Sequence, residues 1–321
     1  MDHCVSVRSI INVVATRVQD GTIYERGAWS MVEHTLSFDD DLEEVRALGR
    51  QCIEDGFASP VRILSPAQAQ HCLSSLQDFE KQCGGSLRSD NRFKIHLLLP
   101  WAWDLVHHPA VVELASACLR TKDVWCWSTD VNAKEPASAT HFTWHQDSTY
   151  AGITPPGQAV TIWLALTPSR RESGCLRCIP RSHVLGQLPH VEGQGGTDNA
   201  LSLQQEIVNL EQAHNLGPDT AQAMVLEPGE ASVHSFWTVH SSSANTTSHR
   251  RIGLAMRFVS AHATKAGKVQ ESATLVSGEG KNIFLPEVRP MQTMGLAEQA
   301  THAAAMALER ANYLPQGGTY S

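Results

Sequence analysis

Residues 251–259, RIGLAMRFV, alternate between large apolar side chains and side chains that are small or charged. The large apolar ones are Ile252, Leu254, Met256 and Phe258. Side chains two apart in a β-strand point to the same face of a sheet, so this alternation predicts a strand with one face packed against neighbouring elements. The other face carries Arg251, Gly253, Ala255 and Arg257. Its glycine and alanine predict room for a small ligand beside a charged group.

Short β-rich runs recur between residues 124 and 259, separated by Gly, Pro, Ser and Asn. We predict strands at residues 124–131, 140–145, 159–166, 175–179, 223–226, 231–239 and 251–259. Seven short strands with intervening turns are typical of a β-sandwich or a jelly roll. The sequence therefore predicts a mainly β core at about residues 124–259.

Helices are predicted on both sides of this β region. Residues 40–55 and 109–119 carry helical patterns, and Ser65 and Pro66 are a typical N-cap and first residue of a helix that continues to about residue 83. The Ala-rich residues 296–314 predict a C-terminal helix. We expect residues 36–321 to form one domain after an N-terminal extension at residues 1–35. The polar, Gly-rich residues 186–220 predict a lid or an irregular loop.

The composition argues against several classes of partner. With 25 Lys and Arg against 33 Asp and Glu, the formal net charge is −8, and no dense basic stripe offsets it. Such a chain repels phosphate backbones, so we expect no nucleic-acid partner. No apolar stretch reaches the roughly 20 residues that span a bilayer, so we expect no membrane partner. Neither end carries a clear targeting signal, which favours a cytoplasmic location.

The eight cysteines are scattered, and most lie in apolar runs. This distribution indicates reduced, buried thiols rather than a disulfide framework. Cys175 and Cys178 form a C-x-x-C motif, but no second pair completes a zinc site. We interpret both as packing residues.

His145 and Asp147, in the run WHQD, are separated by one residue. If this run is extended, both side chains point to the same side, where an imidazole and a carboxylate supply two of the three ligands of a non-haem iron site. The H-x-D pattern also occurs often by chance, so the hypothesis requires a third ligand from elsewhere in the chain.

His240 is the best candidate for the third ligand. It ends an apolar run, a polar turn follows it, and it stands 95 residues after His145, a separation that a jelly roll can close. His234 competes with it. Six residues of unbroken strand would separate the two histidines by about 20 Å, so they could not bind one metal without a bend.

Arg251 begins the strand that follows the turn after His240. A guanidinium grips a carboxylate with two parallel hydrogen bonds, and the far carboxylate of 2-oxoglutarate needs such a partner several ångströms from the iron. Arg250 would point to the other face, and Arg257 would lie about 20 Å further along the strand. Arg251 is therefore the preferred candidate.

Four blocks of sequence, in order and with matching spacing, resemble the phytanoyl-CoA dioxygenase (PhyH) family of Fe(II)- and 2-oxoglutarate-dependent oxygenases. The resemblance covers roughly residues 40–259. The blocks are WHQDSTY at 144–150, AVTIWLALT at 159–167, SGCLRCIPRSH at 173–183 and HSSSANTTSHRRIGL at 240–254. Two departures are visible, since Arg181 and Ser241 stand where the family usually has glycine.

The resemblance implies a double-stranded β-helix, a cupin-like jelly roll, with flanking helices. It implies His145, Asp147 and His240 as catalytic iron ligands. It also implies Arg251, Trp163 and Ser242 at the 2-oxoglutarate, with Lys134 in a looser alignment. The implied cofactors are Fe(II), 2-oxoglutarate and O2, and the implied reaction is hydroxylation of an aliphatic C–H bond of a small molecule with release of succinate and CO2. Related halogenases lack the metal carboxylate, so Asp147 favours hydroxylation.

The substrate side is less defined by the sequence. Gln146, Thr149 and Tyr150 are candidate substrate-facing residues. An acyl-CoA, an amino acid, a phosphonate or a natural-product intermediate would each fit. The alternative function is a non-catalytic cupin-like jelly roll that binds a metal or metabolite, and the discriminating residue is Arg251, since such a binder needs no carboxylate clamp. The sequence does not indicate an oligomeric state.

Overall fold

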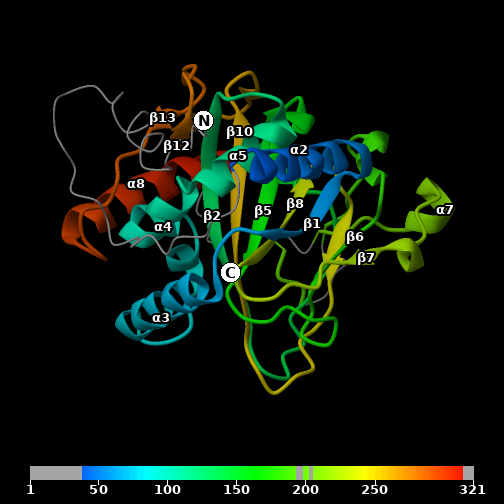
Figure 1. Cartoon of the computed structure of the whole chain (residues 1–321), viewed down its shortest axis with the longest axis horizontal. Coiled ribbons are helices and arrows are strands. Elements are labelled where there is room, and N and C mark those ends of the chain that lie inside the picture. Colours follow the sequence, from blue (N-terminus) through cyan, green and yellow to red (C-terminus); the bar gives the residue numbers. More distant parts are fainter. Residues whose placement is uncertain (1–37, 193–197, 202–204, 314–321) are drawn as a thin grey trace, which may run out of the picture. The chain divides into compact units, whose positions relative to one another are not determined.

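The computed structural model describes residues 38–192, 198–201 and 205–313 (Figure 1). The predicted extension at residues 1–35 and part of the predicted loop at 186–220 lie outside these residues. In the described part of the chain, no helix has both the length and the apolar character that crossing a membrane requires.

The larger of the two main sheets has seven strands and forms the centre of the fold (Figure 1). In spatial order its strands are β1 (Phe57–Arg62), β8 (Glu230–Ser235), β5 (Ala159–Ala165), β10 (Arg251–Ser260), β2 (Val124–Lys134), β12 (Ser272–Ser277) and β13 (Leu285–Pro286). β10 pairs antiparallel with β5 on one side and with β2 on the other. The strand predicted from the alternating pattern is therefore a central strand.

A smaller sheet supplies the second layer of the jelly roll. Its four strands, in spatial order, are β3 (Phe142–His145), β9 (His240–Ser242), β6 (Leu176–Cys178) and β7 (Gln222–Ala223). A separate pair joins β4 (Ile153–Thr154) and β11 (Thr264–Lys265). The prediction of a mainly β, jelly-roll fold is confirmed.

Helices flank the sheets, as predicted. They are α2 (Phe38–Asp55), α3 (Pro66–Gln82), α4 (Pro100–Val106), α5 (Pro109–Leu119) and α8 (Leu296–Tyr313), with the short α6 (Ser148–Ala151) and α7 (Leu210–His214). Helix α5 packs on β5, β10 and β2, and α2 packs on α5 and β1 (Figure 1). Ser65 and Gln68 form a reciprocal capping box at the start of α3, which fixes the beginning of that helix.

The predicted β core was too narrow. β1 and β12 lie outside residues 124–259, and both join the large sheet. The strand predicted at 223–226 is reduced to Gln222–Ala223, with a single bridge between Ser169 and Leu226. All seven described cysteines are free, and Cys175 and Cys178 are both buried.

The strand predicted at 231–239 is interrupted, and this changes the arrangement of the histidines. β8 ends at Ser235, and a turn closed by the Thr238 N–H donating to the Ser235 carbonyl leads into β9 of the other sheet. The Thr238 hydroxyl donates to the Gly56 carbonyl at 2.6 Å, which fixes this turn. The expectation that an unbroken strand keeps His234 away from His240 was therefore wrong.

Candidate metal centre and adjoining cavities

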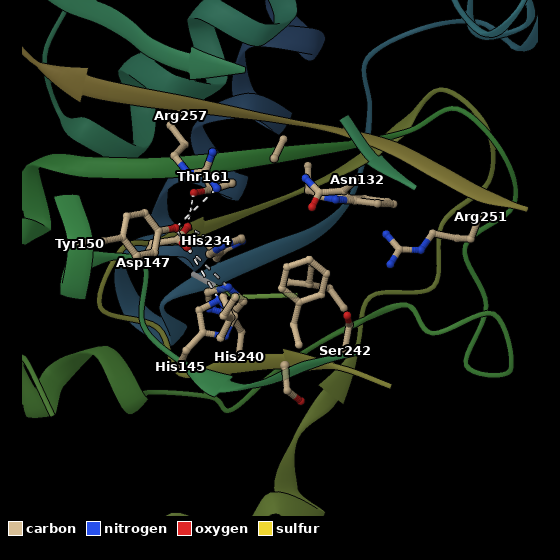
Figure 2. A pocket seen from close by; sticks show the side chains of 16 residues that line it. Asn132, His145, Asp147, Tyr150, Thr161, His234, His240, Ser242, Arg251 and Arg257 are labelled. Carbon is tan, nitrogen blue, oxygen red and sulfur yellow. Dashed lines mark hydrogen bonds and ion pairs between the residues drawn. The ribbon is translucent and has the colours of Figure 1, made fainter. Parts of the chain in front are cut away.

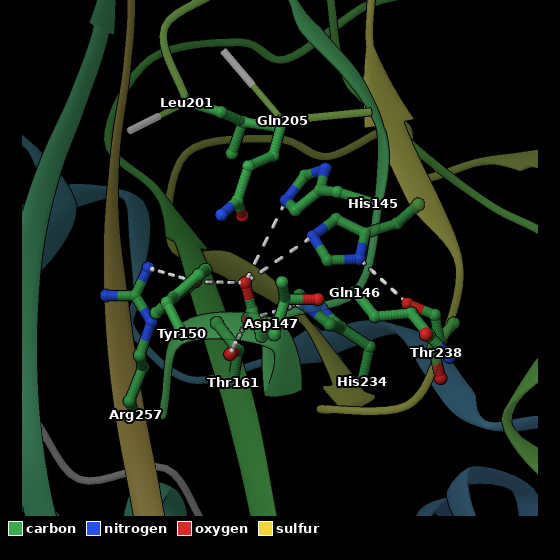
Figure 3. Close-up of polar contacts among 12 residues, drawn as sticks. His145, Gln146, Asp147, Tyr150, Thr161, Leu201, Gln205, His234, Thr238 and Arg257 are labelled. Carbon is green, nitrogen blue, oxygen red and sulfur yellow. Dashed lines mark hydrogen bonds and ion pairs between the residues drawn. The ribbon is translucent and has the colours of Figure 1, made fainter. Parts of the chain in front are cut away.

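His145 and His240 are cross-strand partners in the small sheet, where β3 and β9 run antiparallel. Asp147 follows His145 by two residues, and its Oδ1 lies 3.9 Å from the Nε2 atoms of both histidines (Figure 3). All three candidate ligand atoms lie within 4.8 Å of one another, and all three residues are buried. The structure thus brings together the two segments that are 95 residues apart.

Hydrogen bonds orient both imidazoles in the same way. Nδ1 of His145 lies 2.7 Å from the Thr143 carbonyl, and Nδ1 of His240 lies 2.9 Å from the Thr238 carbonyl. A carbonyl can only accept, so each Nδ1 carries the proton and each Nε2 presents its lone pair to the centre. Burial lowers the pKa of His145 to about 4 and the pKa of His240 well below its usual value, so both rings are neutral at pH 7.

Asp147 reaches the centre by a route that strand alternation did not predict. β3 ends at His145, and Asp147 has helical backbone angles at the start of α6. Its Oδ1 accepts a hydrogen bond from the Tyr150 hydroxyl at 2.5 Å, and its Oδ2 accepts one from the Thr161 hydroxyl at 2.6 Å. The convergence is therefore produced by a turn and two hydroxyl donors rather than by an extended segment.

The charge of Asp147 is stabilised from several sides. Burial alone would raise the pKa of its carboxyl, but the neighbouring imidazole of His234 and the positive charge of Arg257 outweigh this, so the pKa lies well below the usual range. His234 Nε2 lies 3.5 Å from Asp147 Oδ2, and its ring centroid is 4.4 Å from that of His240. Neither ring nitrogen of His234 has a hydrogen-bond partner among the residues that the structure describes.

This donor set fits a single divalent metal of the first transition row. Two neutral imidazoles and one carboxylate on one side of a cavity form the facial triad that non-haem Fe(II) uses, with further coordination positions left for ligands. His234 is not one of the converging ligand atoms. His145, Asp147 and His240 are therefore the residues that could hold the metal.

A cavity extends from this centre between the two sheets (Figure 2). Arg251 points into it from the side away from the candidate ligands, with Asn132 and Ser242 also on the wall (Figure 2). Arg251 is only 2% exposed, and its guanidinium carbon lies 5.0 Å from the centroid of the Trp163 ring. Burial lowers the pKa of Arg251 to about 10.

Lys134 lies beside Arg251, because the two residues are cross-strand partners on β2 and β10. It donates to the Ser242 hydroxyl at 2.7 Å and to two neighbouring carbonyls. Burial, together with the positive charge of Arg251, lowers the pKa of Lys134 to about 6. No described carboxylate forms an ion pair with either residue. A buried guanidinium without an acidic partner among the described residues is costly, so this end of the cavity is suited to an anion such as a carboxylate.

Gly253 has a different role from the one predicted. A Cβ on this residue would lie 2.1 Å from the Trp163 ring, so the space above Gly253 holds the Trp163 indole rather than a ligand. Trp163 in turn supports the Arg251 guanidinium. Arg250 points away, as expected, and pairs with Glu80 and Glu135.

The three candidate substrate residues lie in different places. Tyr150 lines the metal cavity and bonds Asp147. Thr149 lines only a second cavity, described below. Gln146 lies outside both, fully buried, and its side-chain amide bonds the backbone of Gly186, Leu188 and Trp237. Gln146 therefore holds together backbone segments around the site and does not face either cavity.

A larger cavity adjoins the first. Five residues line both: Asn132, Phe142, Tyr150, Leu201 and Arg257. Sequence reasoning missed most of this wall and also Thr161 and His234. The sequence did contain a signal for Arg257, because the alternating pattern puts it on the same face of the strand as Arg251. Arg257 was rejected as a ligand-binding residue because it lies far from Arg251 along the strand, but the cavity extends along that face and both arginines line it. Arg257 forms an ion pair with Asp130. Its guanidinium also lies 3.4 Å from the Tyr150 hydroxyl oxygen (Figure 3).

Removing the Tyr150 hydroxyl should weaken metal binding. We expect Tyr150→Phe to reduce affinity for Fe(II) or Co(II) by about tenfold to a hundredfold, because a hydrogen bond that orients a ligating carboxylate is lost. Anaerobic calorimetric titration measures this effect, and Thr161→Val should act in the same direction. Thr264→Val, on the exposed strand β11, is the control. Unchanged affinity in both Tyr150→Phe and Thr161→Val would contradict a role for these hydroxyls.

Comparisons with known proteins agree with this geometry. A family model described as phytanoyl-CoA dioxygenase (PhyH) matches residues 54–253, more than half of the chain. Phytanoyl-CoA dioxygenase domain-containing protein 1 of Danio rerio is 40% identical over 50 residues, which are 16% of this chain and 17% of that protein. The match thus spans about a sixth of that relative's length.

Two solved structures are similar over most of the chain. The apo structure of ThoJ, a non-heme monooxygenase, is 30% identical with a TM-score of 0.72, over 82% of this chain and 96% of that one. SnoK, a non-heme alpha ketoglutarate dependent carbocyclase from nogalamycin biosynthesis, is 21% identical with a TM-score of 0.53, over 68% and 85% of the two chains. At that identity the second likeness supports the fold alone.

Proposed function

Because this chain belongs to the phytanoyl-CoA dioxygenase (PhyH) family, we propose that it is an Fe(II)- and 2-oxoglutarate-dependent dioxygenase that hydroxylates an aliphatic C–H bond of a small molecule. The observation that carries the proposal is one cavity with a His-Asp-His cluster on one side and, on the other, a buried arginine that has no acidic partner in the described part of the chain. Residues 36–321 would form the single catalytic domain.

The residues divide into two groups. His145, Asp147 and His240 would hold the iron, and Arg251 would bind the far carboxylate of 2-oxoglutarate, with Trp163, Ser242 and Lys134 around it. When bound, Fe(II) and 2-oxoglutarate supply the oxidising chemistry with O2, and succinate and CO2 are released. The protein supplies orientation and a protected cavity.

Each group of side chains has a physical task. The guanidinium of Arg251 can form two parallel hydrogen bonds to a carboxylate, which fixes both the position and the direction of a dicarboxylic acid. Lys134 donates to the Ser242 hydroxyl and so holds it at the same end of the cavity. Phe142, Leu176 and Trp163 line the wall with apolar surface, which limits water near the reacting atoms.

An anaerobic titration tests this proposal. Adding Fe(II) and then 2-oxoglutarate to the purified protein should produce the weak visible absorption band of the iron–oxoacid complex, and succinate should form once oxygen and a substrate are supplied. Fe(II) binding without this band would favour a non-catalytic cupin-like binder. A substrate panel scored for products separates hydroxylation from other outcomes, such as the ring formation that the description of SnoK indicates for that enzyme.

A further inference from the structure

The larger cavity is the natural place for the organic substrate if the proposed function holds. It meets the metal cavity at a shared wall that contains Phe142, Tyr150 and Arg257, so a molecule seated in it would have one end near the metal. Its own walls add the aromatic rings of Phe93 and Trp127 and the amides of Gln205 and Asn312. This lining suits a molecule with an apolar body and a few polar groups.

Arg92 is the feature of this cavity that the proposed reaction does not use. It lines the larger cavity but not the metal cavity. The structure gives its guanidinium no hydrogen bond or ion pair to any described residue, and its Nε is fully buried without a partner. Its guanidinium carbon lies 4.6 Å from the centroid of the Phe93 ring. Burial lowers the pKa of Arg92, and the charge of Asp130 opposes this only in part.

The backbone on which Arg92 sits is firmly anchored. Phe93 forms a β-bridge with Asp130 of β2, and its carbonyl lies 2.9 Å from His302 Nε2 of α8. The next residue, Lys94, is buried and bonds Glu287 at 2.9 Å and the Trp127 carbonyl at 2.6 Å. Arg92 is therefore a partly exposed charged side chain on a fixed backbone, with a buried Nε and no acidic partner among the described residues, and an incoming anion can pair with its guanidinium.

The other arginine of this cavity differs in that respect. Arg257 also lines the larger cavity, but its guanidinium forms an ion pair with Asp130, which neutralises its charge. The arginines that could serve the phosphates of a CoA thioester do not line either cavity. Arg170 pairs with Glu227, and Arg177 lies over the Trp144 ring and bonds the Pro218 carbonyl. The site therefore offers one guanidinium for one acidic group rather than a basic patch for several phosphates.

We propose that Arg92 binds a carboxylate of the organic substrate, and that the substrate class is a carboxylic acid with an aromatic or extended apolar body. This inference rests on the proposed function for the identity of the cavity as a substrate site. The ion pair is distinct from the one that Arg251 makes with the co-substrate, since the two arginines line different cavities.

The test uses matched acids and amides as probes. The pairs are 3-phenylpropanoate and its amide, 5-phenylpentanoate and its amide, and dodecanoate and its amide, titrated by ligand-observed NMR against metal-free protein. In the wild type we expect at least one acid to bind about tenfold more tightly than its amide, as hydrogen bonds between charged groups allow. The preference should disappear in Arg92→Gln, persist in part in Arg92→Lys and persist in Arg251→Met.

Each outcome decides the proposal. Absence of an acid preference in the wild type, or a preference that survives Arg92→Gln and is lost in Arg251→Met, would overturn it. The probes are titrated without iron, so this test does not depend on the iron–oxoacid absorption band. Absence of that band would count against the proposed function, and the preference for acids over amides could still be measured.

The melting temperature of the ligand-free protein is a second measurement, and it distinguishes a ligand-binding role for Arg92 from a structural one. We expect ligand-free Arg92→Gln to melt at the same temperature as the wild type or higher, because the variant removes a charged group whose buried Nε has no partner among the described residues. A fall of several degrees would identify Arg92 as a structural residue and count against the proposal. Arg170→Gln, which removes an exposed ion-pair arginine, is the control for loss of positive charge.

Discussion

Replacing Asp147 with alanine should abolish Fe(II) binding and lower succinate release by about a thousandfold or more. Residues that only orient a metal ligand are worth 10- to 100-fold, and removing the ligand itself must cost more. The carboxylate is also the only anion in the triad, so its loss leaves two neutral imidazoles, which hold Fe(II) weakly. Calorimetric titration with Fe(II) under anaerobic conditions and a succinate assay measure the two effects.

The control for this variant is Asp219→Ala, an exposed aspartate on the segment Pro218–Thr220. Circular dichroism should show that Asp147→Ala keeps its β-sheet content, since the sheets are held by strand pairing away from this side chain. Asp147→Ala that still bound Fe(II) as tightly as the wild type, and still released succinate, would remove the metal-site assignment.

Replacing Arg251 with methionine should raise the concentration of 2-oxoglutarate needed for half-maximal activity by about a hundredfold or more. Truncating one partner of a buried, hydrogen-bonded charge pair costs roughly 2–5 kcal/mol, and each 1.4 kcal/mol is a factor of ten in affinity. Fe(II) binding should be nearly unchanged, because Arg251 and the metal cluster lie on different sides of the cavity (Figure 2). Anaerobic titration of the iron-loaded protein with 2-oxoglutarate measures the change.

Arg250→Met is a closely matched control, because Arg250 is the neighbouring residue and pairs with Glu80 and Glu135 instead of lining the cavity. It should leave the affinity for 2-oxoglutarate unchanged while it lowers thermal stability. Arg251→Lys should recover only part of the affinity, because an ammonium cannot form the two-point contact of a guanidinium. Equal affinities in Arg251→Met and the wild type would contradict the clamp.

Local sequence patterns predicted the elements whose cause is local. The alternation at 251–259 identified β10, because large apolar side chains that recur at every second residue lie on one face of a strand, although both faces of β10 are buried. Ser65 and Pro66 identified the start of α3, because an N-cap acts within a single turn of helix. The sequence also predicted that His145 and His240 could meet, and the antiparallel register of β3 and β9 brings them together.

Features that depend on distant contacts could not be predicted in the same way. The approach of His234 depends on the turn after Ser235, which is fixed by the Thr238 hydroxyl and the carbonyl of Gly56, far away in sequence. Gly253 leaves space for the indole ring of Trp163 on the neighbouring strand, and this contact cannot be seen in the sequence of β10 alone. Arg92 is the last residue of a 3-10 helix of one turn, Ser89–Arg92, which is too short to give a periodic pattern. Only the packing of β2, α8 and Glu287 against the residues that follow shows where Arg92 lies.

The position of β10 between two partner strands has a consequence for ligand length. One part of this strand carries Arg251, and six residues later Arg257 contacts Tyr150, which in turn holds Asp147. Because β10 is hydrogen-bonded on both sides, the positions of Arg251 and Arg257 along it are fixed relative to each other. If Arg251 binds the far carboxylate of 2-oxoglutarate as proposed, an oxo acid with one methylene fewer or more should bind more weakly, because the spacing between Arg251 and the Asp147 side of the cavity cannot adjust to it.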